Sequence, residues 1–231
     1  MQPRQQVVAT ITLALAAMVT PMGGVATADG AVPLGGGAGI IVNGTSCTLT
    51  TIGHDNSGAL VGFTAGSCGG TGASVVAEGS QASGPVGSVA FSAGGKDTLD
   101  YAVIKFDPGK IVPTNNFDGF AINGVGPDPV LGQPECIQGA ATGQACGSVN
   151  VTAINAPSTV VAELPTGNAQ PGDEGAPVTV DGQLVGLFRT GRDHFYVTTF
   201  RSAARFSFTL FSAILNDVNA KGGPGAGFAP I

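Results

Sequence analysis

The side chains best suited to chemistry lie in a glycine-rich stretch, Pro171 to Gly186, with the sequence PGDEGAPVTVDGQLVG. This stretch carries the carboxyl groups of Asp173 and Glu174. Its glycines predict a tight turn, and the short apolar runs that meet at Asp181-Gly182 predict a β-hairpin. On residue types alone, the stretch is a turn that carries acidic groups.

Two further residue types that often do chemistry are the histidines and the cysteines. His54 and His194 lie far apart in turns, and neither has a second ligand at the spacing of a metal site, so we expect no metal and no cofactor. The cysteines fall into two local groups, and the sequence leaves three disulfide pairings open if the chain is exported. The four positions are Cys47, Cys68, Cys136 and Cys146.

The first residues predict export. Residues 1–28 combine an early positive charge at Arg4, an apolar run from Val7 to Val19 and small residues before Asp29, which is the pattern of a signal peptide. The apolar run is shorter than the roughly 20 residues that span a membrane, and a retained anchor is the alternative. We therefore expect a secreted or cell-envelope protein without a membrane span after cleavage.

The composition argues against nucleic-acid binding and against a disordered chain. The formal net charge is −6 and charged residues make up 10% of the chain, so there is no basic surface for nucleic acid. The chain is rich in glycine (38) and proline (15), yet its hydrophobic fraction of 43% is too high for a disordered chain. Many short strands joined by tight turns fit this composition.

The periodicity of apolar residues predicts an all-β chain, which implies a barrel or a sandwich. The expected strands are Gly39 to Val42, Ala59 to Ala65, Ala73 to Ala77, Val86 to Phe91, Tyr101 to Phe106, Val149 to Ile154, Thr159 to Glu163, Val178 to Val180, Leu184 to Arg189 and Phe195 to Phe200. A helical stripe runs from Phe206 to Val218, and the Gly/Pro-rich tail from Lys221 to Ile231 is expected to be loose.

Four segments together resemble the chymotrypsin-like serine proteases. Gly172 to Val178 resembles their GDSGGPV nucleophile loop, and Thr64 to Cys68 (TAGSC) resembles their TAGHC segment. Asp97 to Ile104 (DTLDYAVI) is similar to their D-x-A-V-I strand. Cys136 to Gly147 resembles the C-x-x-G-x-x-T-G-x-x-C-G segment of bacterial, alpha-lytic-type members. The order and spacing of these segments match over nearly the whole mature chain.

The resemblance implies two antiparallel six-stranded β-barrels of chymotrypsin type and a short C-terminal helix. It also implies the disulfides Cys47–Cys68 and Cys136–Cys146. The domains expected on this basis are residues 29–115 as the N-terminal barrel, 116–134 as a linker, and 135–231 as the C-terminal barrel with the helix and the loose tail.

The resemblance also assigns site residues, and two of the three catalytic positions depart from the family. Ser67 stands in place of the general-base histidine and Glu174 in place of the nucleophilic serine, whereas Asp100 keeps the position that orients the histidine. Gly172 occupies the oxyanion-hole position. We therefore expect the catalytic positions to be inactive and the Glu174 carboxylate to fold back toward the Gly172 N–H.

Two more features follow from the resemblance. Bacterial relatives commonly carry an arginine where this chain has Ile137, so Asp173 needs another partner or a different loop conformation. Phe188, Arg189 and Thr190 fall in the strand that lines the specificity pocket, where Arg189 would favour an acidic ligand group. A solvated arginine is the alternative.

Two classes of function remain from the sequence. The favoured one is a secreted, non-catalytic homologue that binds a peptide, a protein or a cell-envelope component between its barrels or on surface loops. The alternative is an enzyme with altered chemistry, in which Asp100 and Glu174 act as a carboxylate pair, or one with residual peptidase activity. The two classes differ in whether a substrate is turned over.

Overall fold

The structure is a computed structural model that describes residues 30–94, 99–152, 159–164, 169–189 and 204–231. Several expectations fall outside the described residues: the signal peptide of residues 1–28, the strand from Phe195 to Phe200, His194, Thr190, and Asp97 with Thr98. The described residues are mostly β-strands, and one α-helix, α1 (Phe211–Lys221), lies near the C-terminal end.

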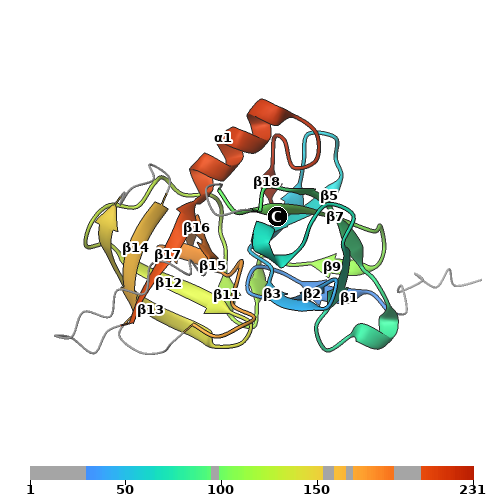
Figure 1. Cartoon of the computed structure of the whole chain (residues 1–231), viewed down its shortest axis with the longest axis horizontal. Coiled ribbons are helices and arrows are strands. Elements are labelled where there is room, and N and C mark those ends of the chain that lie inside the picture. The colour runs from blue at the N-terminus through green and yellow to red at the C-terminus, as the bar shows by residue number, and fades with distance from the viewer. Residues whose placement is uncertain (1–29, 95–98, 153–158, 165–168, 190–203) are drawn as a thin grey trace, which may run out of the picture.

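The first half of the chain forms a sheet in the order β18-β4-β5-β8-β7-β6-β2-β3 (Figure 1). Its strands are β2 (Gly39–Val42), β3 (Thr45–Thr48), β4 (Thr51–His54), β5 (Leu60–Thr64), β6 (Ser74–Ala77), β7 (Gly87–Ser92), β8 (Ala102–Phe106) and β18 (Ala229–Pro230). Alternate side chains of these strands fill the interior. In β2, for example, Ile40 and Val42 are buried and Ile41 is half-buried, as the period of a strand requires.

This sheet closes on itself through the two-residue joint between β3 and β4. Leu49 N donates to Ala38 O (2.8 Å) beside β2, and Thr50 N donates to Phe63 O (2.7 Å) in β5. Strands β3 and β4 are therefore one bent strand that belongs to both ends of the sheet. The sheet has eight strands. If β3 and β4 are counted as one strand and β18 is left out, the remaining strands form a closed ring of six.

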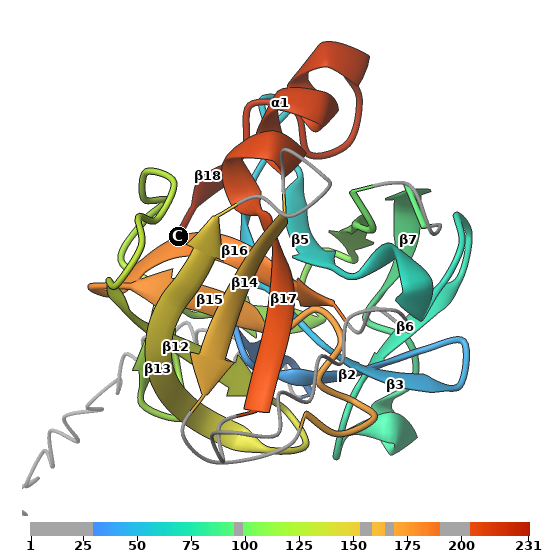
Figure 2. The ribbon, with the colours of Figure 1, turned by 60° about the vertical axis from the view of Figure 1, so that its left-hand side comes forward.

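The second half forms a closed barrel in the order β12-β13-β14-β17-β16-β15 (Figure 2). Its strands are β12 (Pro134–Gly139), β13 (Gly143–Thr152), β14 (Thr159–Leu164), β15 (Pro177–Val180), β16 (Gln183–Arg189) and β17 (Ala204–Leu210). The core includes Val149, Val178, Phe188 and Phe208. The expectation of two six-stranded barrels is confirmed.

Every expected strand within the described residues has a counterpart, and β2 has the expected bounds. The expectation missed β12, β17 and several shorter pieces: β1 (Val32–Leu34), β9 (Ile111–Pro113), β10 (Asn116–Phe117) and β11 (Phe120–Ala121), besides the separate β3, β4 and β18. Strands β1 and β9 form a parallel pair and β10 and β11 a small hairpin. Such two- and three-residue strands are too short to show a period.

The disulfides are Cys47–Cys68 and Cys136–Cys146, with sequence separations of 21 and 10 residues. The pairing implied by the resemblance is confirmed. Each barrel carries one of the bridges, because Cys47 lies in β3 and Cys136 and Cys146 face each other across β12 and β13. In the loop-entropy account, a disulfide that closes a loop of this length stabilises the folded protein by roughly 3 kcal/mol.

The expected helix from Phe206 to Val218 begins too early. Residues through Leu210 belong to β17, which pairs with β14 and with β16, and the helix runs from Phe211 to Lys221. Phe208 lies in the barrel core, so its spacing from Phe211 imitates a helical stripe by coincidence. In Figure 1 the helix lies above the two barrels and leads the chain back to the first one.

The expectation of a loose tail is wrong. Residues 229–230 form β18, which pairs with β4, and Gly225 N donates to an Asp55 carboxylate oxygen at 3.3 Å. The Phe228 ring packs edge-to-face on Phe63, with ring centroids 5.0 Å apart, and also contacts Phe211. The tail therefore covers the first barrel although it follows the second one in sequence.

Replacing Phe228 by alanine is expected to lower the free energy of unfolding by about 1–3 kcal/mol, because a half-buried ring leaves its two aromatic neighbours. Urea denaturation measures this change. Ile231→Ala is the control, since the Ile231 side chain is 42% exposed and its loss should change the stability by less than about 0.5 kcal/mol. Equal effects of the two replacements would contradict a packed tail.

The segment of residues 116–134, predicted to link the two halves, contains the β10–β11 hairpin and then follows β16. Gly126 N donates to Leu184 O (2.9 Å), and Leu184 N donates to Gly124 O (2.8 Å). Near its end, the Asp128 carboxylate accepts a hydrogen bond from the Ser212 hydroxyl in the first turn of α1. The domain boundaries around this segment remain predictions, but β18 belongs to the first sheet.

Candidate functional site

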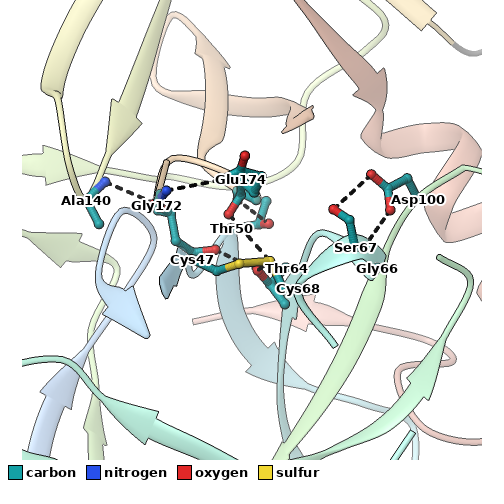
Figure 3. Close-up of a disulfide and its surroundings, with 12 residues drawn as sticks. Cys47, Thr50, Thr64, Gly66, Ser67, Cys68, Asp100, Ala140, Gly172 and Glu174 are labelled. Atoms are coloured by element: carbon teal, nitrogen blue, oxygen red, sulfur yellow. Dashed lines mark hydrogen bonds between the residues drawn. A yellow bond between two sulfur atoms is a disulfide. The ribbon is translucent and has the colours of Figure 1, made fainter. Parts of the chain in front are cut away.

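Asp100 lies two residues before β8 and is held by Ser67. The Ser67 N–H donates to Asp100 Oδ1 at 2.7 Å, and the Ser67 hydroxyl donates to Oδ2 at 3.3 Å (Figure 3). Ser67 sits in a short 3₁₀ turn, η1 (Gly66–Cys68), that directly follows β5. Asp100 is 7% exposed and has a left-handed backbone with φ 49°, a conformation that aspartate adopts more readily than most residues.

The residues on both sides of Asp100 are fixed by the C-terminal segment. The Thr209 hydroxyl of β17 donates to Leu99 O at 3.0 Å, and the Tyr101 hydroxyl donates to an Asp217 carboxylate oxygen of α1 at 2.7 Å. Lys221 in turn pairs with Asp217 one helical turn away. The left-handed backbone conformation of Asp100 is thus held by contacts to both of its neighbours, one from the second barrel and one from α1.

Burial raises the pKa of Asp100 above its ordinary value. The Ser67 N–H, the positive charge of Arg189 and the Ser67 hydroxyl act in the opposite direction, and the negative charge of Glu174 adds to the rise. The position expected to orient a histidine, the residue in place of the nucleophile and the expected pocket arginine therefore influence one another. The structure brings these predicted residues into one electrostatic neighbourhood.

The Glu174 carboxylate folds back onto its own loop. Gly172 N donates to Glu174 Oε2 at 3.1 Å, which is the contact that the sequence predicted (Figure 3). Gly172 has φ +110°, a conformation that glycine adopts without strain. In Figure 3 the Glu174–Gly172 pair and the Ser67–Asp100 pair are separate, and the Cys47–Cys68 disulfide lies beside them.

Two threonines of the first barrel anchor this loop. The Thr48 hydroxyl donates to Gly172 O (2.7 Å) and the Thr50 hydroxyl donates to Gly175 O (2.6 Å), while Thr48 N donates to Glu174 O (2.8 Å). Gly175 has φ +88°, and a Cβ there would lie 2.4 Å from the Thr64 hydroxyl oxygen, so only glycine fits. The loop of the second barrel therefore rests directly on the strand joint of the first.

Asp173 is 1% exposed, and its carboxylate receives four hydrogen bonds. Oδ1 accepts from the N–H groups of Ala141 and Thr142, each at 3.1 Å. Oδ2 accepts from the Thr142 hydroxyl (3.0 Å) and from Gln170 N (2.8 Å). The turn between β12 and β13 therefore supplies three of the four hydrogen bonds, and Gln170 supplies the fourth. Ile137, where bacterial relatives were expected to carry an arginine, lies buried in the core.

The expected pocket residues divide between core and surface. The Phe188 side chain is 2% exposed and belongs to the core of the second barrel, while its backbone bonds to the loop through Gly175 N and Ala176 O. Arg189 is half-buried at the end of β16. Thr190 lies outside the described residues. Only Arg189 of the three presents a described side chain outside the core.

The described residues hold no group of three or more His, Cys, Asp and Glu side chains that could bind a metal ion. His54 is exposed at the end of β4, where the turn toward β5 begins, as expected for a turn histidine. Within the same described ranges, no helix is long and apolar enough to cross a membrane.

Glu135 was not among the residues predicted from the sequence. Its side chain on β12 is 1% exposed, and neither carboxylate oxygen has a hydrogen-bond partner. Burial raises its pKa to about 8. The strand sequence PECIQG lacks the regular apolar alternation that marks inward positions, so a charged residue there does not stand out. Thr48, Thr50 and Thr209 were missed for a different reason, because their partners lie far away in sequence.

No protein-family model and no curated protein matches the sequence. The solved structures that it resembles include Protease A of Thermobifida fusca, with a TM-score of 0.61 and 23% identity over 81% of this chain and 97% of that chain. A second is the chymotrypsin of Cellulomonas bogoriensis, with a TM-score of 0.60 and 24% identity over 86% and 98%. A third is a mutant of human heparin binding protein (CAP37), with a TM-score of 0.51 and 18% identity over 81% and 92%.

These likenesses show the fold. The chain is a chymotrypsin-like double β-barrel, and bacterial serine proteases are among its structural neighbours. At these identities the fold does not carry the chemistry with it, because one fold supports many functions.

Proposed function

We propose that the protein is a secreted, non-catalytic homologue of the chymotrypsin-like serine proteases. It holds a peptide, a protein or a cell-envelope component in the region between its two barrels or on surface loops. The contact that carries the proposal is the hydrogen bond from Gly172 N to Glu174 Oε2. A carboxylate bound there consumes a donor that a protease keeps for the oxyanion, and it adds negative charge where more would have to develop.

The Ser67–Asp100 pair supports the same conclusion. In a serine protease, an imidazole takes the proton of the nucleophile while the aspartate orients the imidazole. Here the Ser67 N–H and hydroxyl satisfy both Asp100 oxygens directly. A serine hydroxyl is no proton acceptor near neutral pH, so the relay has neither a base nor a nucleophile.

The alternative hydrolase has one observation in its favour. Burial raises the pKa of Asp100, and the negative charge of Glu174 adds to that rise. In hydrolases that use two carboxyl groups, the one with the raised pKa stays protonated and acts as the general acid. Against it, each carboxylate already accepts a hydrogen bond, Asp100 from Ser67 and Glu174 from Gly172 in its own loop. Residual peptidase activity is the other alternative, and incubation with casein and a serine-reactive phosphonate tests it.

Export and an acidic ligand complete the proposal. Two disulfides, one in each barrel, fit an oxidising compartment outside the cytoplasm. Arg189 would supply the charge-assisted hydrogen bond for an acidic group of the ligand. One neighbour of the same fold, the heparin binding protein, is named for a ligand, so a binding role is compatible with this architecture.

We expect the mature protein to leave denatured casein intact and to resist labelling by a serine-reactive phosphonate, because base and nucleophile are both replaced. Incubated with peptides from casein cut by a separate protease, it should retain a subset enriched in acidic residues. Mass spectrometry of the peptides that co-elute with the protein measures this selection.

Arg189→Ala should remove the acidic bias, whereas Lys105→Ala, a matched loss of an exposed cation on β8, should leave it unchanged. Cleavage of casein that the phosphonate abolishes would show that the protein is a protease. Retention of no peptide at all would remove the peptide-binding part of the proposal, and an unaltered bias in Arg189→Ala would remove the role of Arg189.

A further inference from the structure

The surroundings of Glu135 strongly disfavour an ionised carboxylate. Its side chain is 1% exposed, and both oxygens lack a hydrogen-bond partner. On β12 it alternates with the buried residues Ile137 and Gly139, which places all three on the inner face of the barrel. Across the ladder it pairs with Gly147 of β13, which has no side chain to offer a partner.

Within the described residues, the two strands that pair with β12 supply no compensating charge. The two strands that pair with β12, namely β13 (GQACGSVNVT) and β15 (PVTV), contain no Asp, Glu, Lys, Arg or His. Elsewhere in the barrel strands the charged residues are Glu163, Arg189 and Arg205. Register pairs Glu163 with Arg205, and Arg189 contributes to the site around Asp100. Burial raises the pKa of Glu135 to about 8.

Strand β12 also leads directly to the candidate site. It ends at Gly139, where a Cβ would lie 2.2 Å from Asp173 Oδ1, so the strand packs tightly on the buried aspartate. The turn that follows supplies the Ala141 and Thr142 N–H groups to Asp173. Any displacement of β12 therefore acts on the loop that carries Glu174.

We propose that Glu135 is a pH-sensitive switch in the second barrel. With the carboxyl protonated, β12 completes the barrel and its following turn holds Asp173. Loss of the proton leaves an unpaired charge in the core, which drives β12 outward and releases the turn from Asp173. This inference rests on the packing of the barrel and is independent of the proposed ligand-binding function.

The direction of the pH effect follows from the two states. The folded protein keeps the Glu135 proton until its pKa of about 8, whereas the unfolded chain releases it near the ordinary value of 4.5. Stability from the protonated form is therefore full below about pH 4.5 and is lost as the pH rises through 8. Between these limits the folding constant falls about tenfold per pH unit, or roughly a few hundredfold from pH 5 to pH 8.

The test compares the wild-type protein with Glu135→Gln, which keeps the shape but has no proton to lose, in urea denaturation at pH 5 and pH 8. Glu78→Gln, a neutralised exposed glutamate in the first half of the chain, is the matched control. The wild type and Glu78→Gln should show the few-hundredfold fall, and Glu135→Gln should lack it. If Glu135→Gln fails to fold, Glu135→Leu replaces it, because an apolar side chain of similar size suits the core.

Hydrogen exchange locates the change. Between pH 6 and pH 9, after correction for the intrinsic pH dependence of exchange, residues 134–142 should lose protection in the wild-type protein but not in Glu135→Gln. Strands β4 and β5 of the first barrel should stay protected in both. Equal pH dependence of stability in the wild type and in the variants of Glu135 would overturn the proposal, as would loss of protection that spares residues 134–142.

Discussion

Replacing Asp173 by alanine is expected to lower the free energy of unfolding by roughly 3–5 kcal/mol. The replacement removes all four hydrogen bonds at once and leaves the N–H groups of Ala141, Thr142 and Gln170 without their acceptor. Each buried donor left unpaired costs about 1–3 kcal/mol. The loss approaches the total stability of many domains, so the loop that carries Glu174 should also lose its conformation.

Urea denaturation of the variant, read by circular dichroism, measures this change. Asp107→Ala is the control, because Asp107 is exposed and its loss should change the stability by less than about 0.5 kcal/mol. If Asp173→Ala does not fold, Thr142→Val gives a milder test, since it removes only the hydroxyl bond to Oδ2 and should cost about 1 kcal/mol. A stability of Asp173→Ala equal to that of Asp107→Ala would show that the four bonds do not hold the loop.

Local patterns in the sequence predicted the parts of the fold that depend on neighbours along the chain. Strand β2 has the alternation of Ile40 and Val42, and its expected bounds were correct. The contact between Gly172 and Glu174 was predictable because the two residues are two positions apart and a glutamate side chain is long enough to reach back. In both cases the deciding interaction joins residues that are close together in the sequence.

The features that the sequence analysis missed or misjudged depend on contacts between residues far apart in the sequence. Asp173 receives three of its four hydrogen bonds from Ala141 and Thr142, 32 and 31 residues away, and the Thr209 hydroxyl reaches Leu99 across 110 residues, so no short window of sequence contains both partners. The tail looked loose because glycine and proline dominate its composition, yet the single ring of Phe228 and the β18–β4 pairing fix it. Composition describes the average residue, whereas one well-packed aromatic side chain decides the position of a segment.

Glu135 illustrates a further reason. Nothing in the sequence distinguishes a glutamate on the inner face of a strand from one on the outer face when the strand lacks apolar alternation. Its burial is set by the register of β12 against β13 and β15, which the barrel as a whole determines. A residue whose chemistry depends on burial therefore appears only once the fold is known.

The double replacement of Ser67 by histidine and Glu174 by serine is expected to create serine-hydrolase activity that neither single replacement shows. The Ser67 backbone is already bonded to Asp100, and its side chain is exposed, so an imidazole at this position has room and an orienting carboxylate beside it. Shortening Glu174 frees the Gly172 N–H for an oxyanion. Because the three residues act as a unit, the single variants should match the unmodified protein.

We expect cleavage of a peptide ester by the double variant at a rate at least about a thousandfold above that of either single variant, together with labelling by a serine-directed phosphonate. Adding Asp100→Asn should abolish the gain, because an amide there no longer stabilises the charged imidazole. The buried Asp173 keeps its four donors in every variant, so the absence of the family's arginine at position 137 need not disturb the loop. Activity in the unmodified protein, or equal activity in the double variant with and without Asp100, would contradict the view that Ser67 and Glu174 are what separate this chain from a working protease.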